Sequence, residues 1–493
     1  MRSKCRLLGI ALVLSGCAVG PNYAPPQKPT TPAYTRKQLP SQTDATAGTG
    51  GESQHFLAGR DLPGQWWTLF GSAKLSALIE QAMAKYPDID AQQAALRAVR
   101  ENVRAEQGVL YPQVRGAAQR LREKVNGAAL APGFPNFITN IYQGTVSVSY
   151  SFDIFGGERR TLEGLQAQAE AQRYRVEASY VTLTSNVASA AIQIASIRGQ
   201  IAATESIVAL EQRQIELIQR EFDVGIRART DVLQQQSILA SERATLPMLQ
   251  QQLAAGEHQL AVLTGQFPAD VAPFELDLSD LQLPQDLPVS LPSALVEQRP
   301  DIKLQEMQMH QASAAIGVAT ANMLPQLTLT GATGAESTRS RTLLDPESGI
   351  WNVAMGIAQP IFEGGTLRAR RRGAVDAYQQ AFAEYRLTVL NAFQNVADTL
   401  TAIENDARRL NAEFDAVTAA KISLEMIQRQ YDAGKVGYIS LLTAQQTYQQ
   451  VQIAYIQAVT SRYTDTVLLF QALGGGWWNR RDGREADGSS VGG

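Results

Sequence analysis

Two segments of the chain carry a seven-residue stripe of apolar residues, and no other feature limits the possible folds as strongly. The first stripe comprises Val187, Ile194, Ile201, Val208, Ile215 and Phe222. The second comprises Val389, Val396, Ile403, Leu410, Val417, Leu424 and Tyr431. A strict heptad of this length predicts long helices that supercoil around helical neighbours with a left-handed twist.

The length of the predicted helices excludes an ordinary globular core. The segment from Glu158 to Phe222 reaches on the order of 100 Å, because a helix rises about 1.5 Å per residue. Two shorter helices, predicted at Leu75–Leu110 and Val232–Leu263, have about the same combined length. We therefore expect one long helix to lie beside two shorter helices stacked end to end.

The chain is also predicted to contain two copies of one unit. Four short sequence landmarks recur in the same order at offsets of 207 to 213 residues. The matching pairs are Tyr86-Pro87-Asp88-Ile89 with Arg299-Pro300-Asp301-Ile302, Pro112-Gln113 with Pro325-Gln326, Ile154-Phe155 with Ile361-Phe362, and Glu221 to Gly225 with Gln430 to Gly434. The copies are predicted at residues 65–266 and 297–478, joined by a proline-rich linker at 267–296.

Each copy includes a segment in which apolar residues alternate with small or polar residues. The alternation runs from Thr145 to Ile154 in the first copy and from Trp351 to Ala358 in the second, and partner strands are predicted at 113–122 and 326–336. About ten such residues are typical of a transmembrane strand. A half-buried strand of a soluble sandwich has the same alternation, but the direct continuation into coiled-coil helices favours the membrane interpretation.

A membrane sheet of four strands per chain requires further copies of the chain. Backbone donors and acceptors at a sheet edge cannot remain unpaired in hydrocarbon, so the strands must close into a barrel with those of other copies. A dimer gives eight strands and a narrow, filled barrel, whereas a trimer gives twelve strands and an open lumen. The strand pattern alone leaves both possibilities open.

The N-terminus predicts export and lipid attachment. A basic start followed by the apolar run Leu7–Leu14 has the order of a secretory signal, predicted at residues 1–16. The stretch Leu14-Ser15-Gly16-Cys17 resembles a lipobox, so Cys17 is expected to become the acylated, palmitate-bearing N-terminus. The alternative is an ordinary signal with an incidental cysteine. Ala18 resembles an outer-membrane sorting residue, because the retention signal for the inner membrane is usually aspartate at that position.

The remaining terminal segments and the composition limit the chemistry. Residues 17–64 are proline-rich and predict an extended tether, and the polar, glycine-rich tail at 479–493 predicts disorder. Cys5 and Cys17 are the two cysteines, so the mature chain has no thiol for a disulfide or a nucleophile. The net charge of −3 argues against nucleic acid as a partner.

No motif of an enzyme or of a metal site fits its required context. The run Gly488-Ser489-Ser490-Val491-Gly492 matches the hydrolase pattern G-x-S-x-G, but it lies in the predicted tail, without the strand and helix that this motif needs. The three histidines, His55, His258 and His310, are isolated from one another in the sequence. We therefore predict no catalytic residues, no metal and no cofactor.

The landmarks together resemble the TolC-like outer membrane factor family, in particular its lipoprotein branch of OprM and NodT. The similarity covers nearly the whole mature chain. It rests on Cys17-Ala18-Val19-Gly20-Pro21, on Trp66-Trp67 with Phe70 and Leu75, on Arg299-Pro300-Asp301-Ile302 through Ala315 to Leu324-Pro325, and on Ala472-Leu473-Gly474-Gly475-Gly476-Trp477. The last two runs are the most specific for the family.

This resemblance implies an α+β membrane protein that assembles as a homotrimer. It implies a 12-stranded outer-membrane β-barrel, with four strands per chain, that continues into a long periplasmic α-helical coiled-coil barrel. The implied function is that of the outer-membrane channel of a tripartite efflux system, lipid-anchored and extending into the periplasm. The implied partners are a periplasmic adaptor and an inner-membrane RND-type pump, which supplies the energy for drugs or small solutes.

Two alternative functions follow from the same pattern. A channel of a type I protein secretion system has the same fold, and the genes beside it would distinguish the two. A pore-less, lipid-anchored coiled-coil scaffold has long helices without conductance.

The resemblance also implies a periplasmic gate at the two helical tips, Phe222–Asp231 and Tyr431–Ser440. Gly225 and Gly434 suit sharp turns between helices, because glycine tolerates a positive φ. In the family a tyrosine bonds an aspartate of the neighbouring tip, and Tyr431 and Asp231 occupy these positions; a turn aspartate is as often a plain helix cap.

Other tip positions follow or depart from the family pattern. Asp432 ends the second long helix at the tip. Compared with the family pattern, Val436 replaces the supporting arginine, and Ser440 and Thr443 replace the acidic residues of the constriction. We therefore do not expect a ring of aspartates to select cations here.

Overall fold

The computed structural model describes residues 18–129, 132–270 and 273–480. The predicted signal at 1–16 and the acylated Cys17 lie outside the described residues. The described chain divides into two compact units. The sheet unit consists of residues 18–26, 95–173 and 304–386, and the helical unit consists of residues 27–94, 174–303 and 387–480.

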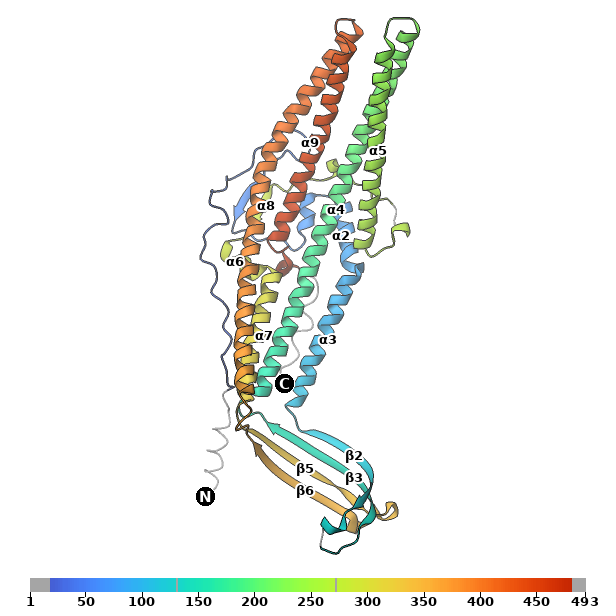
Figure 1. Ribbon diagram of the computed structural model, residues 1–493. Coiled ribbons are helices and arrows are strands. Elements are labelled where there is room, and N and C mark those ends of the chain that lie inside the picture. Colours follow the sequence, from blue (N-terminus) through green and yellow to red (C-terminus); the bar gives the residue numbers. More distant parts are fainter. Residues whose placement is uncertain (1–17, 130–131, 271–272, 481–493) are drawn as a thin grey trace. The chain divides into compact units, whose positions relative to one another are not determined.

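The two halves of the chain have the same order of major elements: two helices, two strands and two further helices (Figure 1). The first half contains α2 (Ala73–Lys85), α3 (Pro87–Val109), β2 (Gln113–Val125), β3 (Phe137–Phe152), α4 (Gly157–Asp223) and α5 (Arg229–Leu263). The second half contains α6 (Pro292–Gln298), α7 (Pro300–Ala321), β5 (Gln326–Ser337), β6 (Gly349–Ala358), α8 (Thr366–Asp432) and α9 (Tyr438–Ala472).

The lengths of corresponding helices are equal in the two halves. Helices α4 and α8 each have 67 residues, and α5 and α9 each have 35. The prediction of a helix from Glu158 to Phe222 is confirmed to within one residue at each end. In the described part of the chain, no helix combines the length and the apolar character needed to cross a bilayer.

The prediction of a single helix at Leu75–Leu110 is wrong. The helix is interrupted at Tyr86, whose ψ of 118° is extended rather than helical. The reason is Pro87, because the proline ring disfavours the α region for the residue before it. Arg299, which precedes Pro300, has the same extended conformation with a ψ of 122°. The repeated proline therefore sets the same break in both halves.

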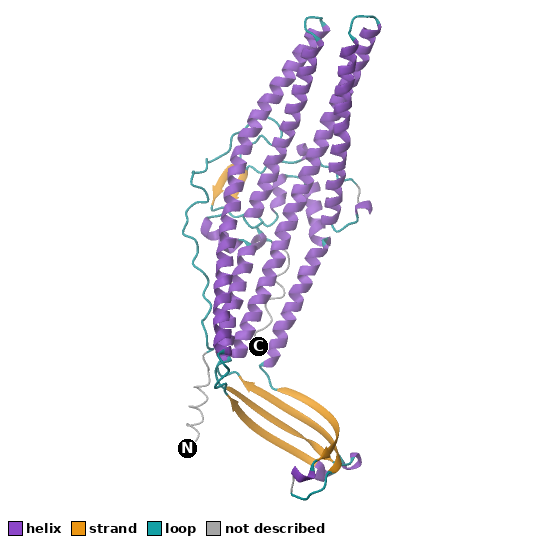
Figure 2. Cartoon of the chain, viewed as in Figure 1, coloured by secondary structure: helices purple, strands orange, loops and turns teal. Residues whose placement is uncertain are grey.

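The four longer strands form one antiparallel sheet in the order β2-β3-β5-β6 (Figure 2). The central pairing, β3 with β5, joins the two halves of the chain, and it places Val148 opposite Gly331. Strands β2 and β6 form the two edges of the sheet.

The predicted strand end at Ile154 is wrong, because β3 ends at Phe152. The alternation continues for two residues beyond the strand, but Asp153 has a different role. Its carboxylate accepts hydrogen bonds from the backbone N–H groups of Glu158, at 3.1 Å, and Arg159, at 3.0 Å. Asp153 therefore satisfies free donors in the first turn of α4.

A second, two-stranded sheet forms where the sequence predicted only a tether and a linker. Strand β1 (His55–Ala58) pairs in parallel with β4 (Asp286–Val289). Leu287 is fully buried, which gives the pairing its apolar contact. Four residues are too few to show an alternation, and Pro288 within β4 is unusual in a strand interior.

Seven short 3-10 helices complete the described elements. They are η1 (Trp66–Phe70), η2 (Gly127–Ala129), η3 (Pro268–Asp270), η4 (Leu278–Asp280), η5 (Ser340–Thr342), η6 (Pro346–Ser348) and η7 (Trp477–Asn479).

The start of the predicted disordered tail is ordered. The Asn479 side chain donates to the carbonyl of Leu62 at 2.8 Å, and Arg480 forms an ion pair with Glu177. The prediction of disorder is therefore wrong for residues 479 and 480, and residues 481–493 lie outside the described residues. The composition of the tail did not show that its first two residues meet partners far away in the sequence.

An aromatic cluster forms the core of the helical unit around η1. The ring centroids of Trp66 and Phe470 lie 5.6 Å apart, and those of Phe70 and Tyr463 lie 6.3 Å apart. All four side chains are almost completely buried. The pair Trp66-Trp67 thus anchors the N-terminal segment on α9 through apolar contact.

Arg462 of α9 holds the preceding part of the N-terminal segment. Its side chain is buried and donates to the carbonyls of Gly50, at 2.8 Å, and Glu52, at 3.1 Å. It also donates to the Gln54 amide oxygen at 3.0 Å and to the Thr43 hydroxyl at 3.2 Å. A buried cation is tolerated here because polar groups of one segment surround it.

We expect Arg462→Ala to lower the free energy of unfolding of the protein by about 3 kcal/mol or more, because it leaves several buried acceptors without a donor. Arg462→Lys keeps the charge and part of the donors, so its loss should be smaller. Denaturant unfolding of the purified protein in detergent measures both. Equal stability of Arg462→Ala and the wild type would contradict this assignment.

Candidate functional site at the helical tips

The predicted gate residues lie where two antiparallel helical pairs turn. Figure 1 shows α4 beside α5 and α8 beside α9, each pair joined by a short turn. Both turns belong to the helical unit. The apolar side chains behind them form one cluster with contributions from all four helices. Its buried members are Ile218, Val232, Tyr431, Tyr438, Leu441 and Leu442.

The two turns have the same backbone geometry because each is built on a glycine. Gly225 has a φ of 81° and Gly434 a φ of 65°. The N–H of the following residue bonds back to the helix, from Ile226 to Glu221 and from Lys435 to Gln430, at 2.8 Å in both cases. This is the Schellman end of a helix, which requires a left-handed residue. The prediction of sharp glycine turns is therefore confirmed.

Tyr431 is bonded by an arginine of the other helical pair. Arg227, in the turn between α4 and α5, donates through Nη2 to the Tyr431 hydroxyl at 2.9 Å. Its Nε donates to the Glu221 carboxylate at 2.7 Å. The guanidinium carbon lies 5.5 Å from the Tyr431 ring centroid. A single cation thus links the two helical pairs at the tip.

The electrostatics favour this link. The hydrogen bond that Arg227 donates to the Glu221 carboxylate raises the pKa of Arg227, and the negative charge of Asp231 nearby acts in the same direction. Burial raises the pKa of the Tyr431 hydroxyl above its usual range. The arginine is therefore always charged and the tyrosine always neutral at physiological pH.

No hydrogen bond joins Tyr431 to Asp231 within the described part of one chain, where the Tyr431 hydroxyl accepts from Arg227 instead, and the bond between neighbouring tips stays a prediction. Asp231 lies in the first turn of α5, where its charge acts on Arg227. The family arginine, expected at Val436, has a counterpart at Arg227, which stands at the same place in the first copy, 209 residues earlier. Val436 packs against the apolar cluster instead. The internal repeat was the signal that could have identified Arg227.

The remaining predicted tip residues are exposed. Asp432, the last residue of α8, accepts a hydrogen bond from Gln428 at 2.9 Å. Ser440 and Thr443, in the first turns of α9, line a depression of about 400 Å³ together with Ser423 and Thr447 of α8 and α9. The lining of this depression contains hydroxyl groups and apolar side chains but no carboxylate.

A polar layer lies next to the apolar cluster, and the sequence analysis missed it. Glu211 of α4 is 1% exposed, Gln235 of α5 is fully buried and Gln445 of α9 is 3% exposed. Both amide atoms of Gln235 and Gln445 and one oxygen of Glu211 have no hydrogen-bond partner among the described residues. Buried polar groups without partners are costly, so this layer weakens the contact between the helical pairs.

Glu211 has a second carboxylate near it. Glu242 of α5, which accepts a hydrogen bond from Gln449 of α9, lies close enough to repel its charge. Burial and, secondly, this repulsion raise the pKa of Glu211 to about 7. The glutamate therefore changes its charge near neutral pH.

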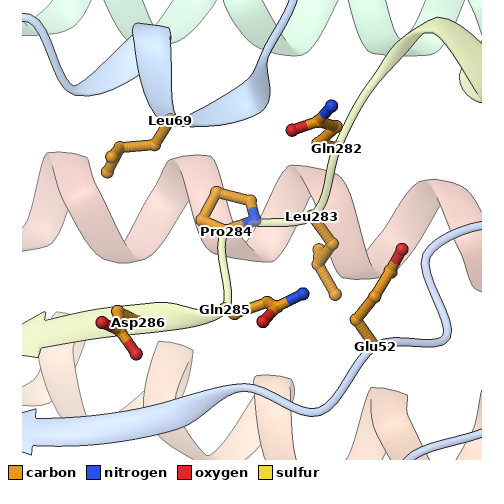
Figure 3. Close-up of a pocket in the computed structure, with 7 residues that line it drawn as sticks. All are labelled: Glu52, Leu69, Gln282, Leu283, Pro284, Gln285 and Asp286. Carbon is orange, nitrogen blue, oxygen red and sulfur yellow. The ribbon is translucent and has the colours of Figure 1, made fainter.

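A cavity beside β4 is a weaker candidate for a functional site than the tips. This cavity has a volume of about 550 Å³ (Figure 3), and the carboxylates of Glu52 and Asp286 lie on opposite sides with Gln285 between them. Asp286 already forms an ion pair with Arg60 at 3.2 Å. Among the described residues, no three histidine, cysteine or carboxylate side chains are grouped so that they could hold a metal ion.

Comparison with known proteins identifies relatives over nearly the whole chain. The probable efflux pump outer membrane protein TtgC of Pseudomonas putida is 28% identical over 97% of this chain and 96% of TtgC. The pyoverdine export outer membrane protein OpmQ of Pseudomonas aeruginosa is 28% identical over 90% of this chain and 94% of OpmQ. Nodulation protein T of Rhizobium leguminosarum bv. trifolii is 26% identical over 82% of each chain.

Solved structures show the same fold. The outer-membrane channel OprN superposes with a TM-score of 0.82 and 27% identity, over 94% of this chain and all of that chain. The CmeC outer membrane channel of Campylobacter jejuni has a TM-score of 0.83 over 95% of this chain and 97% of its own, and its 21% identity supports the fold alone. The predicted α+β fold is confirmed.

The family model described as outer membrane efflux protein matches residues 78–266 and 291–475, which is more than half of the chain. The relatives are channel and efflux proteins rather than enzymes, which agrees with a non-enzymatic role in general. The chain therefore belongs to the outer membrane efflux protein family, which confirms its predicted function in efflux and its predicted place at the outer membrane, extending into the periplasm.

Proposed function

We propose that the chain is the outer-membrane channel of a tripartite efflux system and conducts drugs or small solutes passively to the exterior. The observation that carries this proposal is the four-stranded sheet, which has one exposed apolar face and two unpaired edges. Long helical pairs continue the same chain. A passive duct needs no catalytic site, because the pump supplies the energy.

The apolar face of the sheet supports a membrane position. Alternation and register place Val114, Val146, Val148, Trp351, Val353, Met355 and Ile357 on one face. All seven are exposed, from 40% for Val148 to 79% for Trp351. The opposite face carries small and polar residues, including Ser147, Ser149 and Thr330. Such a sheet suits lipid on one side and a water-filled lumen on the other.

The unpaired edges support a homotrimer. Strands β2 and β6 would pair between copies, and three copies give a closed barrel of twelve strands. Within the chain, β3 pairs with β5 so that Val148 lies opposite Gly331. In the repeat, Val148 corresponds to Met355 of β6 at an offset of 207, and Gly331 corresponds to Ala118 of β2 at an offset of 213. If β6 and β2 of two chains pair in the same register, Met355 lies opposite Ala118 of the second chain. Both residues lie on the apolar face, so the repeated register keeps the two faces of the barrel continuous.

The first described residues support the proposed acylation of Cys17. Val19 donates through its N–H to the Phe155 carbonyl at 2.9 Å and accepts from Arg160 through its carbonyl at 3.2 Å. Phe155 lies between β3 and α4, where the strands end. A lipid two residues before Val19 would therefore lie close to the membrane-facing sheet.

The proposed partners are a periplasmic adaptor and an inner-membrane pump of the RND type. Relatives such as TtgC are described as outer membrane proteins of efflux pumps. The two tips are the surfaces that we propose for adaptor docking and gating. Arg227, Tyr431 and Glu221 would hold the helical pairs together, and the polar layer around Glu211 would allow them to separate when a partner binds.

We expect Arg227→Ala to increase the single-channel conductance of the purified protein several-fold in planar bilayers, because it removes the link between the helical pairs. Tyr431→Phe should have a smaller effect, because the ring still packs on the guanidinium. Arg229→Ala, an exposed arginine in the same tip, is the matched control and should leave the conductance low. Equal currents from Arg227→Ala and Arg229→Ala would show that the gate lies elsewhere. The absence of current from every variant would favour the alternative of a pore-less coiled-coil scaffold.

Glu211→Gln should stabilise the tips at pH 8 and have little effect at pH 4. The raised pKa of Glu211 means that the folded state holds its proton more firmly, so stability is lost as pH rises from about 4.5 to about 7. The loss is of the order of 2 kcal/mol. Hydrogen exchange of the α5 and α9 amides at both pH values measures it. A wild type and variant with the same pH dependence would refute the assignment.

A further inference from the structure

The apolar face of the sheet becomes basic at one end of β2. Along this face β2 presents Val114, Gly116 and Ala118, and then Arg120, Arg122 and Lys124. The register confirms that these residues share a face, because Val114 pairs with Val148 whereas Arg120 pairs with Tyr142. The basic end is the one remote from the helices, since α3 is followed by β2 at Gln113.

The aromatic residues on the same face show where the basic residues lie relative to the apolar band of the proposed barrel. Tyr150 and Phe152, with ring centroids 4.8 Å apart, mark the end nearest to the helices, and Tyr142 marks the other end. Ten residues of a tilted strand, at roughly 3.3 Å per residue, span about 25 Å, which is the height of the apolar band of an outer-membrane barrel. Arg120 lies level with Tyr142, and the other two cations lie beyond it.

The three cations are not paired with anions in the described part of the chain. Within the described residues, Arg120, Arg122 and Lys124 form no ion pair, and all three are exposed. The Arg120 guanidinium lies over the Tyr142 ring at 5.4 Å. The strand carboxylates at this end of the sheet, Glu123 and Glu336, lie on the opposite face, and Asp345 and Glu347 belong to the connection between β5 and β6. Charge is thus separated between the two faces, with the cations on the outward side.

We propose that Arg120, Arg122 and Lys124 bind the phosphate groups of a phosphorylated glycolipid in the outer leaflet. Cations just beyond an apolar band face lipid head groups, and each contributes to binding of anionic lipid. Alternate residues of a strand are spaced at roughly 7 Å, so one head group with more than one phosphate can contact two of them. This inference rests on the proposed barrel.

The test compares Arg120→Gln/Arg122→Gln/Lys124→Gln with the wild type and with Arg115→Gln, which removes a cation from the opposite face of the same strand. Each full-length protein is placed in phosphatidylethanolamine nanodiscs, and binding of lipopolysaccharide, of its dephosphorylated form and of inorganic phosphate is measured. We expect the triple variant to bind lipopolysaccharide at least about tenfold more weakly, because three surface cations are lost. Arg115→Gln should bind like the wild type, and the wild type should bind the dephosphorylated form and free phosphate weakly.

Three results would overturn the inference. These are equal binding by the triple variant and the wild type, equal binding of the dephosphorylated lipid by the wild type, and loss of assembly by the triple variant in lipid-free detergent. The last result would assign the cations to a neighbouring copy. Conductance in phosphatidylethanolamine bilayers is recorded in parallel, so that failure of the channel itself is distinguished from failure of lipid binding.

Discussion

The unpaired edges of the four-stranded sheet are the constraint on which the rest of the structure depends. Strands β2 and β6 each present a row of free backbone groups, and the sheet exposes a face of large apolar residues. A single copy cannot satisfy both demands, because edges need partners and the apolar face needs lipid. The proposed assembly into a closed barrel would meet both demands at once. Within each chain, the β3–β5 pairing joins the two sequence repeats, so β2 and β6 are the edges left for contacts with other chains.

The proposed gate has a different requirement, which is that the helical pairs stay together at the tips and yet separate when a partner binds. The apolar cluster around Tyr431 and Tyr438 packs the four helices, and Arg227 adds one polar link across them. The neighbouring polar layer reduces the free energy gained by this packing, because the amides of Gln235 and Gln445 are buried without partners. A contact that combines a specific link with a weak layer suits a gate that a partner opens.

Helices and strands with a periodic pattern over many residues could be predicted from the sequence. Contacts between short segments that lie far apart in the sequence could not. The heptads predicted α4 and α8, and the alternation predicted β3 and β6, because each pattern extends over eight residues or more. The pairing of β1 with β4 and the contacts of Arg462 depend on residues more than 200 positions apart. The arginine at the tip was sought in the wrong copy, although the repeat offset leads from Val436 to Arg227.

Cross-linking of the proposed barrel edges tests the central claim most directly. The double variant Ala118→Cys/Met355→Cys, made in the full-length chain and oxidised in membranes, places one thiol on each edge of the sheet. Closure of three copies predicts a covalent trimer on a denaturing gel, and each single variant should remain monomeric. A product that stops at the dimer, or no cross-linked product from correctly inserted protein, would contradict the trimeric barrel.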